Sequence, residues 1–133
     1  VVAMVQREVA LRIAEKPGTR TYGILSVLLQ AYYNINYLFT VSEGAFTPPP
    51  KVKSAVIRLT RNSTLHLNCN EELFFKVVKA SFNQRRKTLR NSIRSGFASV
   101  EISEKFSQKR AEQLSVADFV ELTNEVEKFI NKA

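Results

Sequence analysis

The stretch Ile35-Asn36-Tyr37-Leu38-Phe39-Thr40-Val41 alternates apolar and polar side chains over most of its length and so predicts a strand. Its apolar face would carry Ile35, Tyr37, Phe39 and Val41. A loop containing Pro48-Pro49-Pro50 follows, and the next β-branched run, Ala55–Thr60, predicts a second strand. Because a loop rather than a helix joins the two strands, we expect them to pair antiparallel.

Toward the N-terminus, the run Val1–Gln6 is apolar and β-branched, which predicts a strand buried on both faces, as in a parallel sheet. From Arg7 the apolar period becomes helical, with Val5, Val9 and Ile13 on one face. Lys16-Pro17-Gly18 is expected to end this helix. A second helical stripe follows, formed by Leu25, Leu28, Leu29 and Tyr32.

The second half of the chain predicts helices alone. Asn70 is a good N-cap, and one helix, or two with a break near Asn83, fits the apolar period that continues to Gly96. A short helix is expected over 104–112, and Ser115 with Asp118 forms a capping box. This box would open a last helix with one apolar side, made of Phe119, Thr123, Val126 and Ile130. The predicted architecture is an α/β part over residues 1–62 followed by an all-α part over 63–133.

Composition excludes several classes of protein. The 133 residues are 44% apolar, enough for one globular domain, and one Cys with one His exclude a disulfide framework and a zinc knuckle. The glycines are too far apart for a Gly-rich phosphate loop: Gly18, Gly23, Gly44 and Gly96. The uncharged stretch 21–42 contains Gln30, Asn34 and Asn36, which argues against a membrane span. We therefore expect a cytoplasmic protein in a reducing compartment.

Positive charge is concentrated in one segment. The chain carries a net charge of +8, and the basic residues are densest between Gln84 and Arg94. On a continuous helix, one sector opposite the apolar face would carry Lys76, Lys79, Arg86, Lys87, Arg90 and Arg94, with Arg85 nearer the core and half-buried. Acidic residues are absent from 76–96, so the charge is not neutralised locally. This pattern predicts sequence-independent contact with nucleic-acid phosphates; a solvated helix face is the alternative.

The proline-rich loop holds the second candidate feature. Three prolines stiffen the backbone beside Phe46, so this ring could stack on a flipped-out base. Burial of Phe46 in the core, or use of the loop as a proline-rich ligand, are the alternatives. His66 and Cys69 do not make a metal site by themselves, and the isolated carboxylates Glu8, Glu15 and Glu43 make no catalytic set.

Five strings, taken in order, resemble the C-terminal half of the bacterial small-subunit (16S) rRNA adenine N6-dimethyltransferases (dimethyladenosine transferases). The strings are Met4–Ala10, Tyr22–Val27, Ala45–Val56, Phe82–Ser92 and Arg110–Ser115. The resemblance covers essentially the whole chain. It departs from the family pattern at Ile24, where many relatives have Arg, and at Lys53, where many have an acidic residue.

The resemblance implies the end of a Rossmann-like methyltransferase sheet followed by a small helical domain. The strands 1–6, 35–41 and 55–60 would be the last three of seven. The complete enzyme would use S-adenosylmethionine to dimethylate two adjacent adenosines near the 3′ end of small-subunit rRNA. In the family the methyl-donor site and an Asn-x-Pro-Tyr-type motif lie N-terminal to this segment. The chain alone is therefore expected to hold no catalytic, cofactor or metal site and to be inactive; a non-catalytic RNA-binding module of ribosome assembly is the alternative.

The resemblance also assigns roles to residues. Phe46 matches the aromatic that packs against the target adenine. The basic string that faces rRNA is matched by Arg85, Arg86, Lys87 and Arg90, and with the neighbouring cations the predicted RNA-binding set is Lys51, Lys79, Arg85, Arg86, Lys87, Arg90 and Arg94. The expected partner is the immature small ribosomal subunit. Since a parallel strand needs neighbours on both edges, the chain is also expected to self-associate through an open sheet edge.

Overall fold

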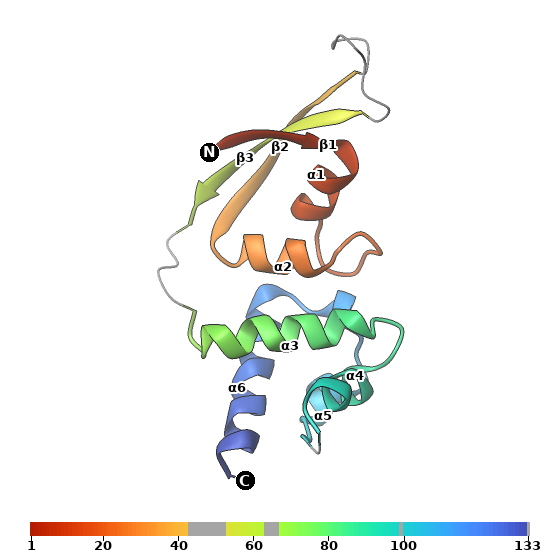
Figure 1. Ribbon diagram of the computed structural model, residues 1–133, viewed down its shortest axis with the longest axis vertical. Helices are drawn as coiled ribbons and strands as arrows, with labels where there is room; N and C mark the ends of the chain where they lie inside the picture. The colour runs from red at the N-terminus through yellow and green to blue at the C-terminus, as the bar shows by residue number, and fades with distance from the viewer. Residues whose placement is uncertain (43–52, 63–66, 99, 133) are drawn as a thin grey trace.

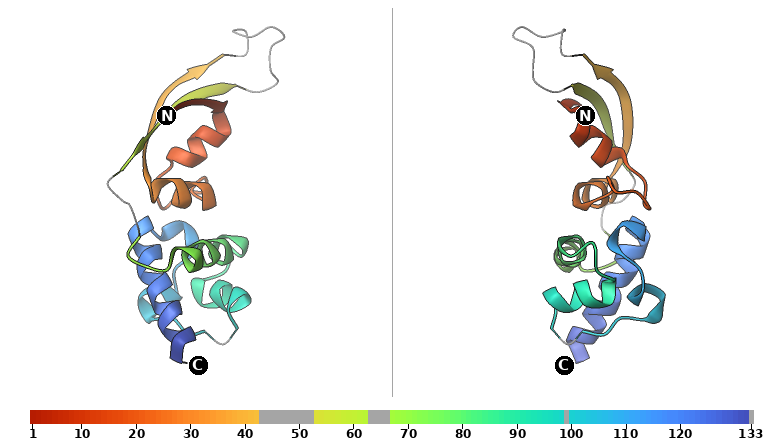
Figure 2. Two further views of the ribbon diagram at one scale, coloured as in Figure 1. Left: turned by 60° about the vertical axis from the view of Figure 1, so that its left-hand side comes forward. Right: turned by 90° about the vertical axis from the view of Figure 1, so that its right-hand side faces the viewer.

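The computed structural model describes residues 1–42, 53–62, 67–98 and 100–132. Its sheet has the order β1-β3-β2, with strands β1 (Val2–Gln6), β2 (Tyr33–Val41) and β3 (Ser54–Arg61). β2 pairs antiparallel with β3, as predicted. The strand predicted over Val1–Gln6 is confirmed as β1, but its predicted burial on both faces, as in a parallel sheet, is wrong: β1 also pairs antiparallel with β3, and Val2 and Met4 are exposed. Helices cover one face of this sheet, so alternate side chains of β1 remain in solvent (Figure 2).

A β-bulge changes the predicted face of β2. Tyr37 lies opposite Ile57, but Phe39 lies opposite Val56, so Leu38 is the extra residue. The bulge reverses the alternation, and Phe39 is therefore 56% exposed instead of buried beside Ile35. The prediction that Phe39 shares the apolar face is wrong because the period of two does not reveal an inserted residue.

Two short helices lie on the covered face. α1 (Arg7–Ala14) ends before Lys16-Pro17-Gly18, as predicted, and α2 (Ile24–Gln30) follows. The Gln30 side-chain amide donates hydrogen bonds of 2.8 Å to the carbonyls of Ile13 and Glu15, which α1 leaves without helical partners. The predicted stripe on α2 is partly wrong, because Leu25 is 41% exposed and Val27 is fully buried.

The helical part contains α3 (Glu71–Asn83), α4 (Leu89–Gly96), α5 (Glu104–Ser107) and α6 (Val116–Lys132). The two-helix alternative is confirmed by the end of α3 at Asn83. The single helix expected over 104–112 is wrong, since α5 is followed by a separate 3₁₀ turn, Ala111–Gln113. In the confirmed capping box, the Asp118 amide donates to Ser115 Oγ at 3.2 Å and the Ser115 amide donates to Asp118 Oδ2 at 3.1 Å.

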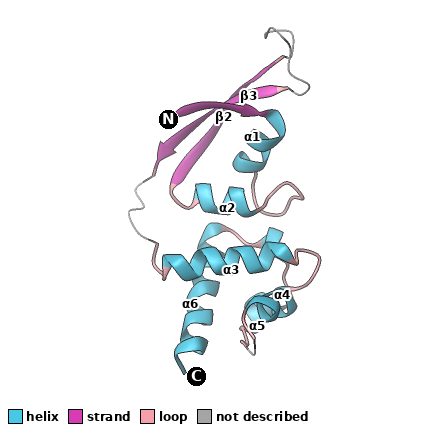
Figure 3. Cartoon of the chain, viewed as in Figure 1, coloured by secondary structure: helices cyan, strands magenta, loops and turns pink. Residues whose placement is uncertain are grey.

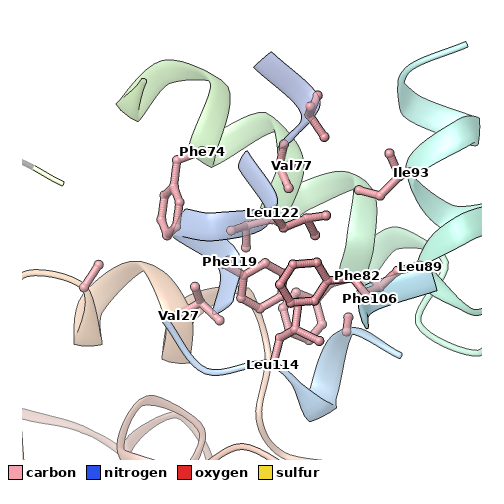
Figure 4. Packing of buried hydrophobic residues seen from close by; sticks show 14 of the residues in the cluster. Val27, Phe74, Val77, Phe82, Leu89, Ile93, Phe106, Leu114, Phe119 and Leu122 are labelled. Carbon is pink, nitrogen blue, oxygen red and sulfur yellow. The ribbon is translucent and has the colours of Figure 1, made fainter. Parts of the chain in front are cut away.

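The sheet and α1 lie at one end of the long axis, α3 to α6 lie at the other end, and α2 lies between them (Figures 1 and 3). Phe74, Phe82, Phe106 and Phe119 pack in the larger core, which Figure 4 shows around Leu114 and Leu122. This core also contains Tyr22, Val27 and Ala31 from the first part of the chain. The last helix departs from its predicted stripe at Ile130, which is 43% exposed. Among the described residues no helix has the length and apolarity that a membrane crossing requires.

Candidate nucleic-acid interface

The predicted basic residues do not lie on one helical face. Lys76 and Lys79 belong to α3, which ends at Asn83, and the backbone leaves helical geometry at Gln84 (φ −124°, ψ 48°). The segment 84–88 then carries Arg85, Arg86 and Lys87, and α4 carries Arg90 and Arg94. The single-helix strip is therefore wrong in shape, although every one of these side chains except Arg85 is exposed. Phe46 and Lys51 lie outside the described residues.

Arg85 has a structural role. It is half-buried, as predicted, and its Nη2 donates a 2.9 Å hydrogen bond to the carbonyl of Tyr22. Its guanidinium carbon lies 5.6 Å from the centroid of the Phe82 ring, in cation–π geometry. These contacts fix the segment 84–88 against the residues that precede α2.

The remaining cationic side chains of this segment and of α4 are exposed to solvent. Arg94 faces Glu101 at 3.8 Å, so part of its field is neutralised. Within the described ranges no ion pair involves Arg86, Lys87 or Arg90. An exposed pair such as Arg94–Glu101 contributes little to stability.

Two backbone hydrogen bonds bring further arginines to the same place. The Gly18 amide donates to the carbonyl of Glu112 at 2.5 Å, and the Leu89 amide donates to the carbonyl of Lys109 at 2.7 Å. Gly18 has φ +97°, which favours glycine and turns the segment 15–23 toward the 3₁₀ turn. Arg20 and Arg110, which are distant in sequence, therefore lie beside Arg85 and Arg86.

We call this group the arginine seam: Arg20, Arg85, Arg86 and Arg110. Together with Glu112 these residues line a hollow of about 450 Å³. A second hollow, of about 410 Å³, shares Arg20 and Arg85 with it, and we call it the apolar-walled hollow. Its lining is Arg12, Arg20, Thr21, Gly23, Ile24, Leu25, Phe82 and Arg85.

The charge of the two hollows selects for anions. Glu112 is the one acidic side chain in either lining, against five arginines. Guanidinium groups bind phosphate oxygens in bidentate geometry, and a cluster of them is typical of a nucleic-acid backbone site. Sequence reasoning missed Arg12, Arg20 and Arg110 in this role. Arg110 begins a string that resembles the dimethyltransferases, but Arg20 has no local signal because tertiary contacts bring it to the seam.

A separate contact joins the sheet to the helical part. The Tyr32 hydroxyl donates to Glu71 Oε1 at 2.5 Å, and the Arg61 guanidinium carbon lies 5.0 Å from the Tyr32 ring centroid. Burial, followed by the hydrogen bond to Glu71, raises the pKa of Tyr32 to about 12. Burial also raises the pKa of the nearby Cys69 thiol. Among the described residues no group of three or more His, Cys, Asp or Glu side chains could hold a metal.

Comparison with known families gives the ancestry of the chain. The family model described as ribosomal RNA adenine dimethylase matches residues 1–128. The chain belongs to this family. It is 60% identical over 132 residues to ribosomal RNA small subunit methyltransferase A of Bacteroides thetaiotaomicron, with 98% of this chain and 49% of that protein covered. The protein of the same name from Cytophaga hutchinsonii is 62% identical over 125 residues, covering 93% of this chain and 48% of the relative.

The predicted family is thus confirmed, and the chain spans about half the length of the curated relatives it matches. Solved structures agree on the fold. A dimethyladenosine transferase from Plasmodium falciparum superposes with a TM-score of 0.80 at 22% identity, covering 96% of this chain and 56% of that one. The 23S rRNA methyltransferase ErmE gives a TM-score of 0.58 at 19% identity and covers 95% of this chain and 54% of that one. The three-stranded sheet with its helices corresponds to a part of such folds.

Proposed function

We propose that this chain is the C-terminal portion of an S-adenosylmethionine-dependent rRNA adenine N6,N6-dimethyltransferase. The complete protein would dimethylate two adjacent adenosines near the 3′ end of small-subunit rRNA, on the immature small ribosomal subunit. The match to the ribosomal RNA adenine dimethylase family over residues 1–128 carries this proposal. The clustered arginines of the seam support it, because they give this portion a surface for RNA phosphates.

In this proposal the chain binds and orients rRNA. The arginine seam, Lys79 of α3, Lys87, Arg90 and Arg94 of α4, and Lys51 would contact the RNA backbone. Phe46 would pack against the target base. Each neutralised phosphate contributes about −0.7 to −0.9 to the slope of log affinity against log salt, so four contacts give a slope of about −3. The proposed boundary between the methyltransferase part and the helical part stays at residue 62.

The described residues do not form a site suited to the methyl donor, S-adenosylmethionine. The donor's sulfonium is a cation, whereas the apolar-walled hollow and the seam are lined with arginines. Three other hollows among the described residues are also lined by helix and loop residues. Nucleotide-type cofactors of open α/β sheets bind at the carboxyl ends of strands. We therefore propose that this chain alone binds no donor and transfers no methyl group.

The proposal is tested in the full-length protein with Arg86→Glu and Arg90→Glu combined. Both side chains are exposed, so the fold is expected to survive while phosphate contacts are lost. Affinity for immature small subunits should fall at least about tenfold, and the salt slope should become shallower by about 1 to 2. Arg58→Glu, a charge reversal at another exposed arginine on β3, is the control and should leave the affinity and the salt slope unchanged. Unchanged affinity and slope in the double variant would contradict the role of this surface.

A methylation assay tests whether this chain binds RNA without itself transferring methyl groups. The full-length protein should methylate adenosines of immature subunits, and the 133-residue chain should not, while both bind the subunit in filter-binding measurements. Absence of methylation by the full-length protein with intact binding would favour a non-catalytic assembly module. Methylation by the 133-residue chain alone would overturn the proposal that it holds no donor site.

A further inference from the structure

The apolar-walled hollow has walls that are fixed before any ligand binds. The buried Ser26 hydroxyl donates to the carbonyl of Arg12 and accepts from the Gly23 amide at 3.0 Å, which ties α1 to the start of α2. Arg85 is held by Tyr22 and Phe82 on the opposite side. The volume of about 410 Å³ lies within the range of about 300–1,000 Å³ that is usual for small-ligand sites.

Its lining combines two chemistries. Arg12, Arg20 and Arg85 supply positive charge, and the lining contains no acidic residue. Beside them Leu25 is 41% exposed and Ile24 is half-buried, so an apolar wall is open to the hollow. A phosphate backbone accounts for the arginines but not for this apolar wall. An unpaired base accounts for both, because it has apolar faces and lies next to a phosphate.

Arg85 adds a surface suited to a base. Its guanidinium is planar, half-buried and already oriented by the hydrogen bond to Tyr22 and the contact with the Phe82 ring. Bases stack on guanidinium planes as they do on aromatic rings. Because the group is fixed before binding, little side-chain entropy remains to be lost when a base stacks on it.

The position of the hollow fits a nucleotide on a strand. Arg20 and Arg85 line both this hollow and the arginine seam, so the two sites are adjacent. A base paired within a helix keeps its faces in the stack, whereas an unpaired base exposes them. We propose that the apolar-walled hollow binds one unpaired base of the RNA whose phosphates lie along the arginine seam. The inference rests on the proposed function and names the part of the RNA that this chain would recognise.

The test uses the full-length protein and three short RNA hairpins: one with a single unpaired adenosine in the stem, one with an abasic residue at that place, and one fully paired. The hairpin with the unpaired adenosine should bind at least about fivefold more tightly than the other two, since stacking of one base contributes about 1 kcal/mol or more. Replacement of the adenosine by 2-aminopurine should give fluorescence quenching on binding. This comparison needs no protein variant and therefore does not depend on how a variant folds.

Variants then locate the effect. Leu25→Ser should reduce the preference for the unpaired adenosine to less than about twofold and leave the salt slope unchanged. Leu38→Ser is the matched control: Leu38 is 37% exposed on β2 and should keep the preference. Arg20→Gln should weaken all three hairpins and make the slope shallower by about 1.

The outcomes separate the two proposals. Equal affinity for the three hairpins, with a steep salt dependence, would overturn the base site and leave the phosphate-binding function intact. Preference for the unpaired adenosine that survives Leu25→Ser would also overturn the site. Salt-independent or absent binding of all three hairpins would count against the proposed function itself.

Discussion

Arg85 contacts the folded chain both through a hydrogen bond of its charged guanidinium and through the flat face of that group. Its Nη2 bonds to the Tyr22 carbonyl at 2.9 Å, and its guanidinium covers the Phe82 ring. We expect Arg85→Gln to lower the free energy of unfolding by about 1–3 kcal/mol, because a charged hydrogen bond and a cation–π contact are lost. Urea denaturation followed by circular dichroism measures this. Arg86→Gln is the control and should change the value by less than about 0.5 kcal/mol, and equal effects of the two would contradict the structural role.

Tyr32 is expected to make the free energy of unfolding depend on pH in the alkaline range. Its pKa is about 12 in the folded chain, above its ordinary value of 10.0, because burial and the hydrogen bond to Glu71 favour the protonated hydroxyl. The stabilisation is therefore complete below pH 10 and is lost as the pH rises toward 12. Denaturation at a series of pH values should show a steeper loss in this window for the unmodified chain than for Tyr32→Phe.

The control for Tyr32 is Tyr33→Phe, because the Tyr33 ring lies 5.5 Å from the same Arg61 guanidinium carbon. Tyr33→Phe should show the same steep loss of stability between pH 10 and pH 12 as the unmodified chain. Identical pH profiles for the unmodified chain and Tyr32→Phe would mean that the bond to Glu71 does not contribute.

At the scale of elements, the approach of α4 to α3 depends on one glycine. A Cβ built on Gly96 would lie 2.8 Å from the Cβ of Ala80. We expect Gly96→Ala to lower the unfolding free energy by about 1–3 kcal/mol, since two packed helices would have to move apart. Gly23→Ala is the control without a clash, because a Cβ built on Gly23 would lie 4.0 Å from its nearest neighbour, the Thr21 carbonyl oxygen.

A double variant separates this clash from helix propensity. Ala80→Gly removes the opposing Cβ and by itself costs about 1 kcal/mol in a helix. If the clash is the cause, Gly96→Ala should destabilise the Ala80→Gly background much less than the unmodified chain. Additive losses in urea denaturation would show that the two Cβ positions do not meet.

At the scale of the whole chain, β1 forms one edge of the sheet that the described residues make. Among the described strands it pairs with β3 alone, and Val2 and Met4 are 60% and 54% exposed. We expect the 133-residue chain to self-associate through this edge, and Val2→Lys with Met4→Lys to shift it toward monomer in sedimentation velocity. Leu38→Lys, on the opposite edge strand, should leave the association unchanged. A chain that is monomeric before any substitution would contradict the expectation.

The sequence by itself determined the family, most of the strand and helix pattern and the basic segment, because periodicity, caps and motif strings are read over short distances along the chain. Asn70, for example, accepts from the Leu73 amide at 3.0 Å, as its N-cap position predicts. The bulge at Leu38 was not evident, since it does not disturb the apolar composition around it. The break after Asn83 was one of two interpretations that fitted the apolar period, and the structure selects it.

The tertiary structure alone decided the shape of the candidate interface. Arg20 and Arg110 join Arg85 and Arg86 because the Gly18–Glu112 and Leu89–Lys109 backbone bonds connect segments that are far apart in sequence. The same folding left Leu25 exposed beside Arg12 and Arg85, so that apolar and cationic groups meet in one hollow. The number of charged residues can be counted along the sequence. The direction in which those charges point, and the apolar side chains that lie beside them, depend on packing between distant segments.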